Sequence, residues 1–150
     1  MAKPISFFGK DEPYFELSNF APFGFVEDGV SWPTVEHYFQ AQKFPDPEHA
    51  DYRERIRTAG SPQHAKTLGQ TRDVPIRPDW DTVKETIMQK ALRQKFANAA
   101  LRKLLVGTGK RLLIENSPYD RYWGCGRNGK GKNRLGVLLM ELREELRSEK

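Results

Sequence analysis

The stretch Thr82-Val-Lys-Glu-Thr-Ile-Met-Gln-Lys-Ala-Leu-Arg-Gln-Lys-Phe96 decides the fold class. Its apolar residues are spaced three and four apart, so they fall on one stripe of a helix: Val83, Ile87, Met88, Ala91, Leu92 and Phe96. Thr82 and Glu85 form the pattern of a capping box, which predicts that the helix starts there. A long helix that packs through one face is therefore expected.

Further helices are predicted on both sides of this stretch. Proline is favoured in the first turn of a helix, and glycine often follows the last turn. A helix also usually ends at or before the residue that precedes a proline. An apolar stripe of leucines also marks the end of the chain. The expected helices run from Pro33 to about Phe44, from about Pro47 to Thr58, from Ser61-Pro62 through Leu68 to a stop at Gly69, around Leu101 to Leu105 with an end at Gly107, and over Leu135 to Leu146.

Strands are expected to be few and short. Ile5 to Phe8 and Leu112 to Ile114 are typical strand segments, and Phe23 to Trp32 is expected to form a hairpin around Asp28-Gly29. Strands and helices do not alternate, which argues against a doubly wound sheet. The predicted fold is α+β and mainly α: a compact single-domain helical bundle with a small β element, covering residues 1–150.

Composition narrows the class of protein. A chain of 150 residues is long enough to bury a core without a disulfide or a metal, and the single cysteine, Cys125, excludes both a disulfide framework and a cysteine zinc cluster. No apolar run reaches the length of roughly 20 residues that a membrane helix needs. The first residues lack the apolar stretch of a signal peptide. We therefore expect a cytoplasmic protein that does not enter a membrane. The three histidines lie in separate segments, so neither a metal nor another cofactor is expected.

The net charge of +5 is concentrated in one glycine-rich segment. Residues 121–134 hold five basic residues and no acidic one, which leaves twenty of each in the rest of the chain. Charge gathered in one loop is typical of a site for a small anion such as a phosphate. The alternative is a flexible, solvated basic loop.

The predicted helix from Pro33 to Phe44 carries the first group of candidate residues. Glu36, Gln40 and Lys43 follow at spacings of four and three, so they share one face. A carboxylate, an amide and an amine on one stripe could line a pocket for a polar ligand. The alternatives are a first-turn acid that complements the helix dipole and a solvated last-turn lysine. His37 lies off this face and is expected to be a packing residue.

The segment from Ser117 to Asn133 carries the second group. Its Gly124-Cys-Gly-Arg-Asn-Gly129 pattern matches G-x-G-x-x-G, but it lacks the βαβ context of a dinucleotide fingerprint and the spacing of a P-loop. What remains is a glycine loop whose main-chain N–H groups and lysines could hold a phosphate, leading into the start of the last helix. Asp120 and Trp123 add a carboxylate and a stacking surface. The alternative is a turn aspartate and a core tryptophan.

These blocks taken together resemble the YbiA-like (NADAR) family, in order from about Ile5 to the end of the chain. The resemblance rests on Ser18-Asn19-Phe20, Trp32 to Phe44, Trp80 with Val83-Lys84, Ala91 to Phe96, Asp120 to Gly124 and Gly129 to Gly136. It implies a mainly helical fold and enzymes that hydrolyse N-glycosidic bonds. Stand-alone members act on ribosylamino-pyrimidine phosphates, early intermediates of riboflavin synthesis, and other members remove ADP-ribose from guanine bases. Close relatives have an aspartate where this chain has Cys125, so we leave Cys125 out of the site.

The resemblance and the residue patterns give one set of expected site residues. An oxocarbenium-like transition state needs a nearby carboxylate and help for the leaving nitrogen, for which we select Glu36 and Asp120 respectively. In the guanine-ADP-ribose branch the lysine that matches Lys43 is thought to attack the opened ribose as a Schiff base, which requires a neutral amine. The expected substrate-binding residues are Asn19, Trp32, Gln40, Trp80, Trp123, Lys130, Lys132 and Asn133.

The expected partner is thus a small phosphorylated ribosyl substrate. Nucleic acid is expected only as the carrier of ADP-ribosylated guanine, and the sequence does not indicate an oligomeric state. Two non-enzymatic hypotheses stay open. A nucleotide-binding sensor would use the same pocket without turnover, and a nucleic-acid-binding module would use the basic loop and bind with a steep salt dependence.

Overall fold

The long helix that the sequence predicts is α4, Trp80–Lys95, in the computed structural model, which describes residues 2–149. The predicted start at Thr82 is wrong, because the helix begins two residues earlier. The carbonyl oxygen of Asp79 accepts the amides of Thr82 and Val83, at 2.9 and 3.1 Å. The Asp79 carboxylate is itself held by Arg77, whose Nε donates to Oδ1 at 2.6 Å. The main-chain turn at Asp79, rather than a capping box, starts α4.

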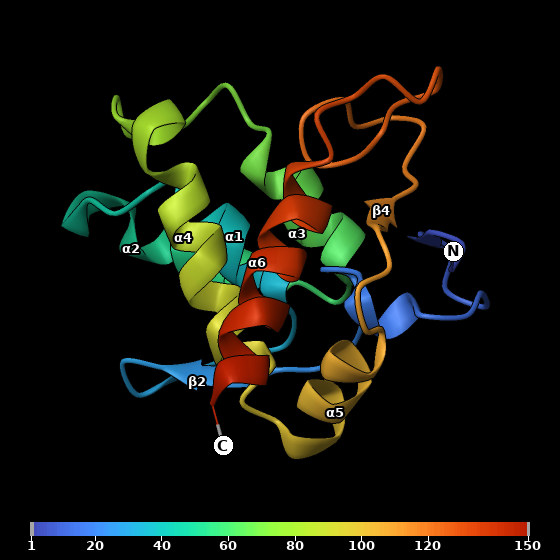
Figure 1. Cartoon of the computed structure of the whole chain (residues 1–150). Helices are drawn as coiled ribbons and strands as arrows, with labels where there is room; N and C mark the ends of the chain where they lie inside the picture. The colour runs from blue at the N-terminus through green and yellow to red at the C-terminus, as the bar shows by residue number, and fades with distance from the viewer. Residues whose placement is uncertain (1, 150) are drawn as a thin grey trace. The chain divides into compact units, whose positions relative to one another are not determined.

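Two compact units make up the chain, one over residues 22–95 and the other over residues 2–21 and 96–149. In the first unit a central helix, α1, contacts α2, α3 and α4 (Figure 1). This unit contains β2 (Phe25–Glu27), β3 (Val30–Trp32), α1 (Val35–Ala41), the 3-10 turn η2 (Pro47–His49), α2 (Ala50–Arg57), α3 (Pro62–Gly69) and α4. The three contacts make α1 the core of the unit.

The predicted hairpin is confirmed. Strands β2 and β3 pair antiparallel, with Phe25 opposite Trp32, and the turn residues Asp28 and Gly29 have φ angles of 52° and 76°. Two consecutive positive φ angles characterise the tight turn that Asp-Gly favours, because its twist matches that of the strands.

Helix α1 is shorter at both ends than the predicted range from Pro33 to Phe44. It begins at Val35 because Thr34 is its N-cap, with Oγ1 accepting the amide of His37 at 3.1 Å. The predicted charged helix from Pro47 is also divided, since η2 precedes α2. At α1 the Thr34 cap, rather than Pro33, therefore sets where the helix begins.

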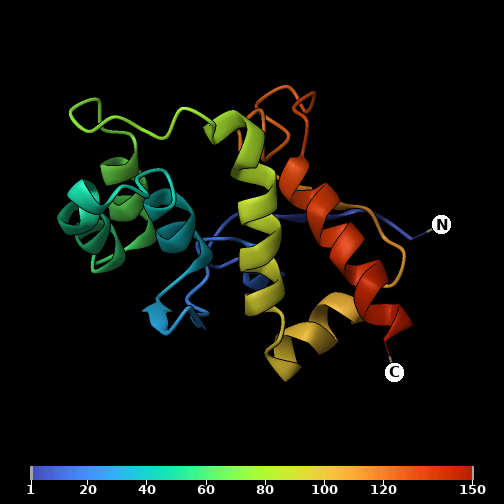
Figure 2. The same cartoon turned by 90° about the vertical axis from the view of Figure 1, so that its left-hand side faces the viewer.

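The second unit contains the parallel strand pair β1 (Ile5–Phe7) and β4 (Leu113–Glu115). The 3-10 turn η1 (Phe15–Leu17) and helices α5 (Ala99–Gly107) and α6 (Arg134–Ser148) complete it. Helices α5 and α6 lie side by side (Figure 2). In the predicted leucine stripe on α6, Leu146 is only half-buried and the other four leucines are buried: Leu135, Leu138, Leu139 and Leu142.

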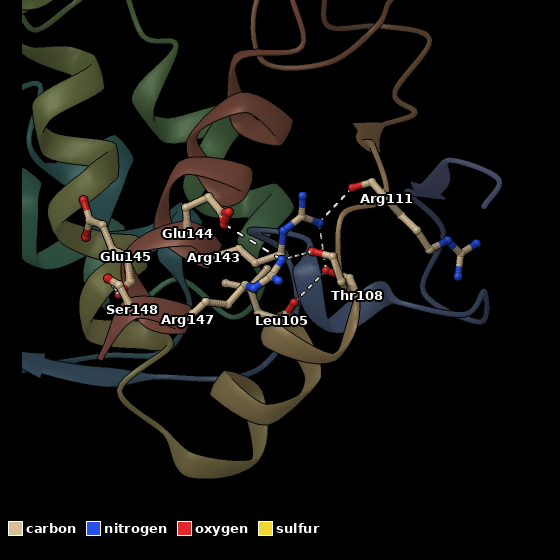
Figure 3. Close-up of polar contacts among 9 residues, drawn as sticks. Leu105, Thr108, Arg111, Arg143, Glu144, Glu145, Arg147 and Ser148 are labelled. Atoms are coloured by element: carbon tan, nitrogen blue, oxygen red, sulfur yellow. Dashed lines mark hydrogen bonds and ion pairs between the residues drawn. The ribbon is translucent and has the colours of Figure 1, made fainter. Parts of the chain in front are cut away.

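Arg143 ties α6 to the turn that follows α5 (Figure 3). Its side chain is 5% exposed, and one terminal nitrogen donates to Thr108 Oγ1 at 3.0 Å and to the Arg111 carbonyl at 2.8 Å. Burial lowers the pKa of the guanidinium, because desolvation disfavours its charge. These two hydrogen bonds hold the connection between α5 and β4 against the last helix.

The described residues form six α-helices and four three-residue strands, so the prediction of a mainly helical α+β fold is confirmed. That residues 1–150 make a single domain stays a prediction. Within residues 2–149, no helix combines the length and hydrophobicity that crossing a membrane requires.

Candidate functional site

The polar face of α1 is buried rather than solvated. Glu36 and Gln40 are 7% and 4% exposed, and Gln40 Nε2 donates to Glu36 Oε2 at 2.6 Å. A carboxylate this deep in the protein needs hydrogen bonds to offset the loss of water. The structure therefore brings two of the sequence-predicted site residues into direct contact. Glu36 also lies in the first turn of α1, as the alternative of a first-turn acid holds, but its side chain is buried.

Lys43 lies two residues beyond the end of α1 and is only partly exposed. Its Nζ donates to the Gly69 carbonyl at 3.2 Å and lies 5.9 Å from the centre of the Trp80 ring. Burial lowers the pKa of Lys43; the charge of Glu36 acts to raise it and that of Lys66 to lower it. The amine is thus in the kind of environment that favours a neutral nucleophile.

The tryptophans of this unit are packed against other rings. Trp80 is 8% exposed and lies 4.9 Å from Phe39, centre to centre. Trp32, also largely buried, meets Tyr38 edge-on at 5.3 Å. Burial raises the pKa of Tyr38 to about 12, with smaller contributions from nearby acids. Each of the two tryptophans thus has a ring neighbour, and their predicted role in substrate binding stays a prediction.

His37 is the packing residue that the sequence predicts. Its Nδ1 lies 2.8 Å from Thr34 Oγ1 and its Nε2 lies 3.0 Å from the Ala59 carbonyl oxygen, so the ring joins the start of α1 to the segment after α2. Burial lowers its pKa, chiefly through desolvation.

Asp120 and Trp123 lie in the other unit, on the segment between β4 and α6. Asp120 Oδ1 accepts the amides of Tyr122 and Trp123, at 2.9 and 2.7 Å, so the carboxylate shapes a turn. The half-buried Trp123 ring meets Tyr122 edge-on at 4.9 Å. These contacts agree with the alternative in which Asp120 is a turn aspartate. Asn19 belongs to the same unit but lies outside the segment between β4 and α6, and its side chain is buried.

Five main-chain N–H groups at the end of the glycine loop already have partners within the chain, and that the loop holds a phosphate stays a prediction. The amides of residues 131–135 donate to carbonyl oxygens of residues 121–125: those of Gly131, Lys132, Asn133, Arg134 and Leu135 to Cys125, Arg121, Gly124, Tyr122 and Trp123 respectively. The loop therefore closes on itself, and these bonds include the first amides of α6 that would otherwise attract an anion.

The side chains of the loop differ in their availability. Lys130 and Lys132 are exposed, and Lys132 Nζ lies 5.5 Å from the centre of the Tyr122 ring. Asn133 has a φ of 51°, and its side-chain amide is bonded at both ends to β4, with Oδ1 accepting the Glu115 amide and Nδ2 donating to the Leu113 carbonyl. The two lysine side chains are exposed, and their predicted role in phosphate binding stays a prediction, whereas Asn133 anchors the loop to the strand.

Comparison with known proteins decides the family. A family model described as the NADAR domain matches residues 6–147. The chain belongs to the NADAR domain family. Among curated NADAR relatives, N-glycosidase YbiA of Escherichia coli strain K12 is 52% identical over 147 residues, which cover 97% of this chain and 90% of that protein. N-glycosidase Npun_R5314 of Nostoc punctiforme is 45% identical, covering 96% and 93%.

A solved NADAR structure has the same fold. The NMR structure of E. coli YbiA superposes with a TM-score of 0.87 at 51% identity, covering 98% of this chain and 86% of that one. A longer relative, the riboflavin biosynthesis protein VVA0006 of Vibrio vulnificus, is 38% identical over 97% of this chain, which spans 39% of its length.

The sequence did not predict that α3 contributes to the candidate site. Gly69 was expected only to stop a helix, yet its carbonyl contacts Lys43 and its Cα lies against Gln40. The only signal in the sequence was a glycine at the end of a predicted helix. Such a glycine can mark either the end of the helix or a close contact with another helix.

One group of residues offers metal ligands. Asp46, Glu48 and His49 bring ligand atoms within 4.8 Å of one another among the described residues. Both acids are exposed, and Glu48 Oε1 lies 3.7 Å from His49 Nε2, which is an ordinary ion-pair geometry if the ring is protonated. None of the three belongs to the residues selected for catalysis.

Proposed function

We propose that this protein is a cytoplasmic N-glycosidase that hydrolyses the bond between ribose and nitrogen in ribosylamino-pyrimidine phosphates, the reactive early intermediates of riboflavin synthesis. Destroying such intermediates before they damage other molecules would be its role. The names of relatives support the reaction, since YbiA and Npun_R5314 are called N-glycosidases. The names of more distant relatives, the riboflavin biosynthesis proteins PYRR of Zea mays and VVA0006, support the substrate class.

The buried pair of Glu36 and Gln40 beside α3 carries this proposal. Hydrolysis of an N-ribosyl bond develops positive charge at the anomeric carbon, and a desolvated carboxylate stabilises that charge far better than a solvated one. Gln40 fixes the rotamer of Glu36 through the 2.6 Å hydrogen bond. In the proposed reaction Glu36 takes a proton from the attacking water, which forms the new C–O bond while the C–N bond breaks.

The leaving nitrogen must gain a proton as the C–N bond breaks, and we assign this step to Asp120 as a proposal. Lys130 and Lys132 would bind the phosphate and so hold the ribose in place, because an ammonium gains most from a doubly charged group. Trp123 and Trp80 would contact the base, and Asn19, Trp32, Gln40 and Asn133 complete the proposed binding residues.

The environment of Lys43 favours a second candidate function, removal of ADP-ribose from guanine bases. A neutral Lys43 amine would bond to C1 of the opened ribose, and the C–N bond to the base would break as the base nitrogen takes a proton. Water would then hydrolyse the imine and return the amine. The lowered pKa of Lys43 supports this route, because it increases the neutral fraction at a given pH. Glu36 could carry the protons.

One assay compares these candidates. The protein is incubated with ribosylamino-pyrimidine phosphate and, separately, with ADP-ribosylated guanosine, and ribose 5-phosphate or ADP-ribose is measured. We expect release of ribose 5-phosphate. Release of ADP-ribose alone would favour the second function, and a stable complex without product would favour the nucleotide sensor. Borohydride added during turnover would trap an imine on Lys43, which mass spectrometry locates.

A further inference from the structure

The last residue of α3 touches two of the residues selected for catalysis or substrate binding. A β-carbon placed on Gly69 would lie 2.0 Å from Gln40 Oε1, 2.8 Å from Cδ and 2.9 Å from Cβ, all too close for any real side chain. The same residue uses its carbonyl oxygen to accept Lys43 Nζ at 3.2 Å. Helices α1 and α3 therefore meet at Gly69 at a distance that only glycine permits.

The conformation of Gly69 does not explain the choice of residue. Gly69 ends α3 and is absent from the glycines with positive φ, so its dihedral angles suit any amino acid. Glycine costs a helix roughly 1 kcal/mol relative to alanine, so the absence of a β-carbon needs a reason in packing. The contact with Gln40 supplies that reason.

The contact restricts Gln40 on one side while Glu36 restrains it on the other. Gln40 is 4% exposed, and its Oε1 has no hydrogen-bond partner among the described residues. Leaving a buried acceptor unpaired is unfavourable, and a rotated side chain would gain a partner elsewhere only by releasing Glu36. Gly69 packs directly against this side chain, so we expect it to oppose such a rotation and to favour the contact between Nε2 and the Glu36 carboxylate.

The free carbonyl at the end of α3 acts on Lys43. The last four carbonyls of a helix have no partner within the helix, and Gly69 offers one of them to Nζ. This hydrogen bond takes one of the N–H groups and fixes where the others, or the lone pair of a neutral amine, point. The charged groups that act on Lys43 are Glu36 on α1, the helix that precedes it, and Lys66 on α3, one turn before Gly69.

We propose that Gly69 is a positioning residue of this site: the approach that its missing β-carbon allows holds Gln40 on Glu36 and brings a helix-end carbonyl to Lys43. The inference rests on the proposed function for its effect on turnover. Its effect on Lys43 is independent of any substrate.

The test is Gly69→Ala with Gly107→Ala as the matched control. Gly107 is also the last residue of a helix, and a β-carbon there meets nothing within 4 Å. In Gly69→Ala the methyl group pushes the α3 end away from α1, which admits water to Lys43 and distances it from Lys66. Both changes raise the pKa of Lys43 toward its ordinary value, and they should outweigh the loss of the Gly69 acceptor because burial is the largest cause of the lowered pKa. A displacement of about 1 Å can also reduce kcat by up to roughly a hundredfold, with a smaller change in KM.

Two readouts separate the inference from the proposed function. The pKa of Lys43 is measured by NMR after reductive methylation with ¹³C-formaldehyde, with Lys43→Arg to assign the signal. Turnover is measured as kcat and KM. We expect Gly69→Ala to raise the Lys43 pKa and lower kcat while Gly107→Ala changes neither. A Gly69→Ala protein that is less stable but keeps the Lys43 pKa would overturn the inference. A wild-type protein without turnover would overturn the proposed function only, and the pKa comparison would still decide the role of Gly69.

A second variant covers the case in which Gly69→Ala does not fold. Gln40→Ala removes Oε1 and Cδ, the atoms at 2.0 and 2.8 Å, and leaves only the Cβ contact at 2.9 Å. If Gly69 acts through Gln40, the double variant should match Gln40→Ala in both the Lys43 pKa and kcat, because contacting residues are not additive. A large further change in the double variant would refute the proposed route through Gln40.

Discussion

Replacing Glu36 with glutamine tests the centre of the proposed site. The new side chain has the same shape and keeps an oxygen that can accept Gln40 Nε2, now 2.6 Å from Glu36 Oε2. A charge-assisted hydrogen bond becomes a neutral one, a loss of about 1 kcal/mol, while the cost of burying the charge disappears. The free energy of unfolding should therefore change by no more than about 1–2 kcal/mol.

The effect on turnover should be much larger. Loss of a general base costs about 10²- to 10⁴-fold in rate, equivalent to roughly 3–5 kcal/mol of transition-state stabilisation. The charge of Glu36 raises the pKa of Lys43, so its removal lowers that pKa further and leaves more neutral amine. If Lys43 alone carried the reaction, the same substitution would extend activity to lower pH instead of abolishing it.

The assay is steady-state kinetics from pH 5.5 to 9 with unfolding by urea as the stability control. Glu48→Gln is the matched control variant, because Glu48 is an exposed acid in the first turn of η2. This control protein should have the kcat of the wild type. A Glu36→Gln protein with kcat within about threefold of wild type would refute the assignment of Glu36 as general base, since that ratio is less than 1 kcal/mol.

Four further predictions concern other parts of the chain. Changing Lys130 and Lys132 together to alanine should raise KM for phosphorylated substrate by about tenfold or more and leave the dephosphorylated nucleoside unchanged, an effect that shrinks with added salt. Equal losses for both substrates would mean that the lysines support the loop. His37 has a pKa below 6.5 in the folded protein, so its contribution to stability is present above pH 6.5 and lost as the pH falls through the folded pKa. His37→Gln should flatten urea-unfolding stability measured from pH 7.5 to 5.5, and an unchanged slope would contradict this. Arg143→Met should cost about 1–3 kcal/mol of unfolding free energy, because Arg111 and Thr108 lose their buried donor; a neutral effect in urea would show that the desolvation of the guanidinium cancels its hydrogen bonds. Treatment with chelator should leave N-glycosidase activity intact, and activity restored only by zinc or magnesium would show that a metal takes part.

Local patterns in the sequence predicted where the helices lie, because apolar stripes mark α4 and α6 and proline or glycine signals mark the ends of the others. The hairpin at Asp28-Gly29 was predictable for the same reason. Helix starts were less so: Thr34 and Asp79 begin α1 and α4 through hydrogen bonds that compete with nearby proline or capping-box signals. Which of two adjacent caps prevails depends on tertiary packing that a local pattern does not contain.

The candidate site divides in a similar way. The shared face of Glu36 and Gln40 follows from helix periodicity, and the structure places them in contact. The role of Gly69 could not be predicted, because it depends on which helix packs against α1. The glycine loop shows the same limit of local patterns. Its composition suggested free amides, but composition does not reveal that the loop pairs with its own preceding segment.

The self-paired glycine loop has a consequence for how the protein could acquire new specificity. Because the backbone of residues 131–135 is held by residues 121–125, the loop does not depend on a ligand for its shape. Binding then incurs little ordering entropy in this segment, and a ligand meets a preformed frame. The exposed side chains on that frame, such as Arg121 and Lys132, can be exchanged one at a time without rebuilding it. Point substitutions at these exposed positions could therefore change the charge that the loop presents without changing its backbone.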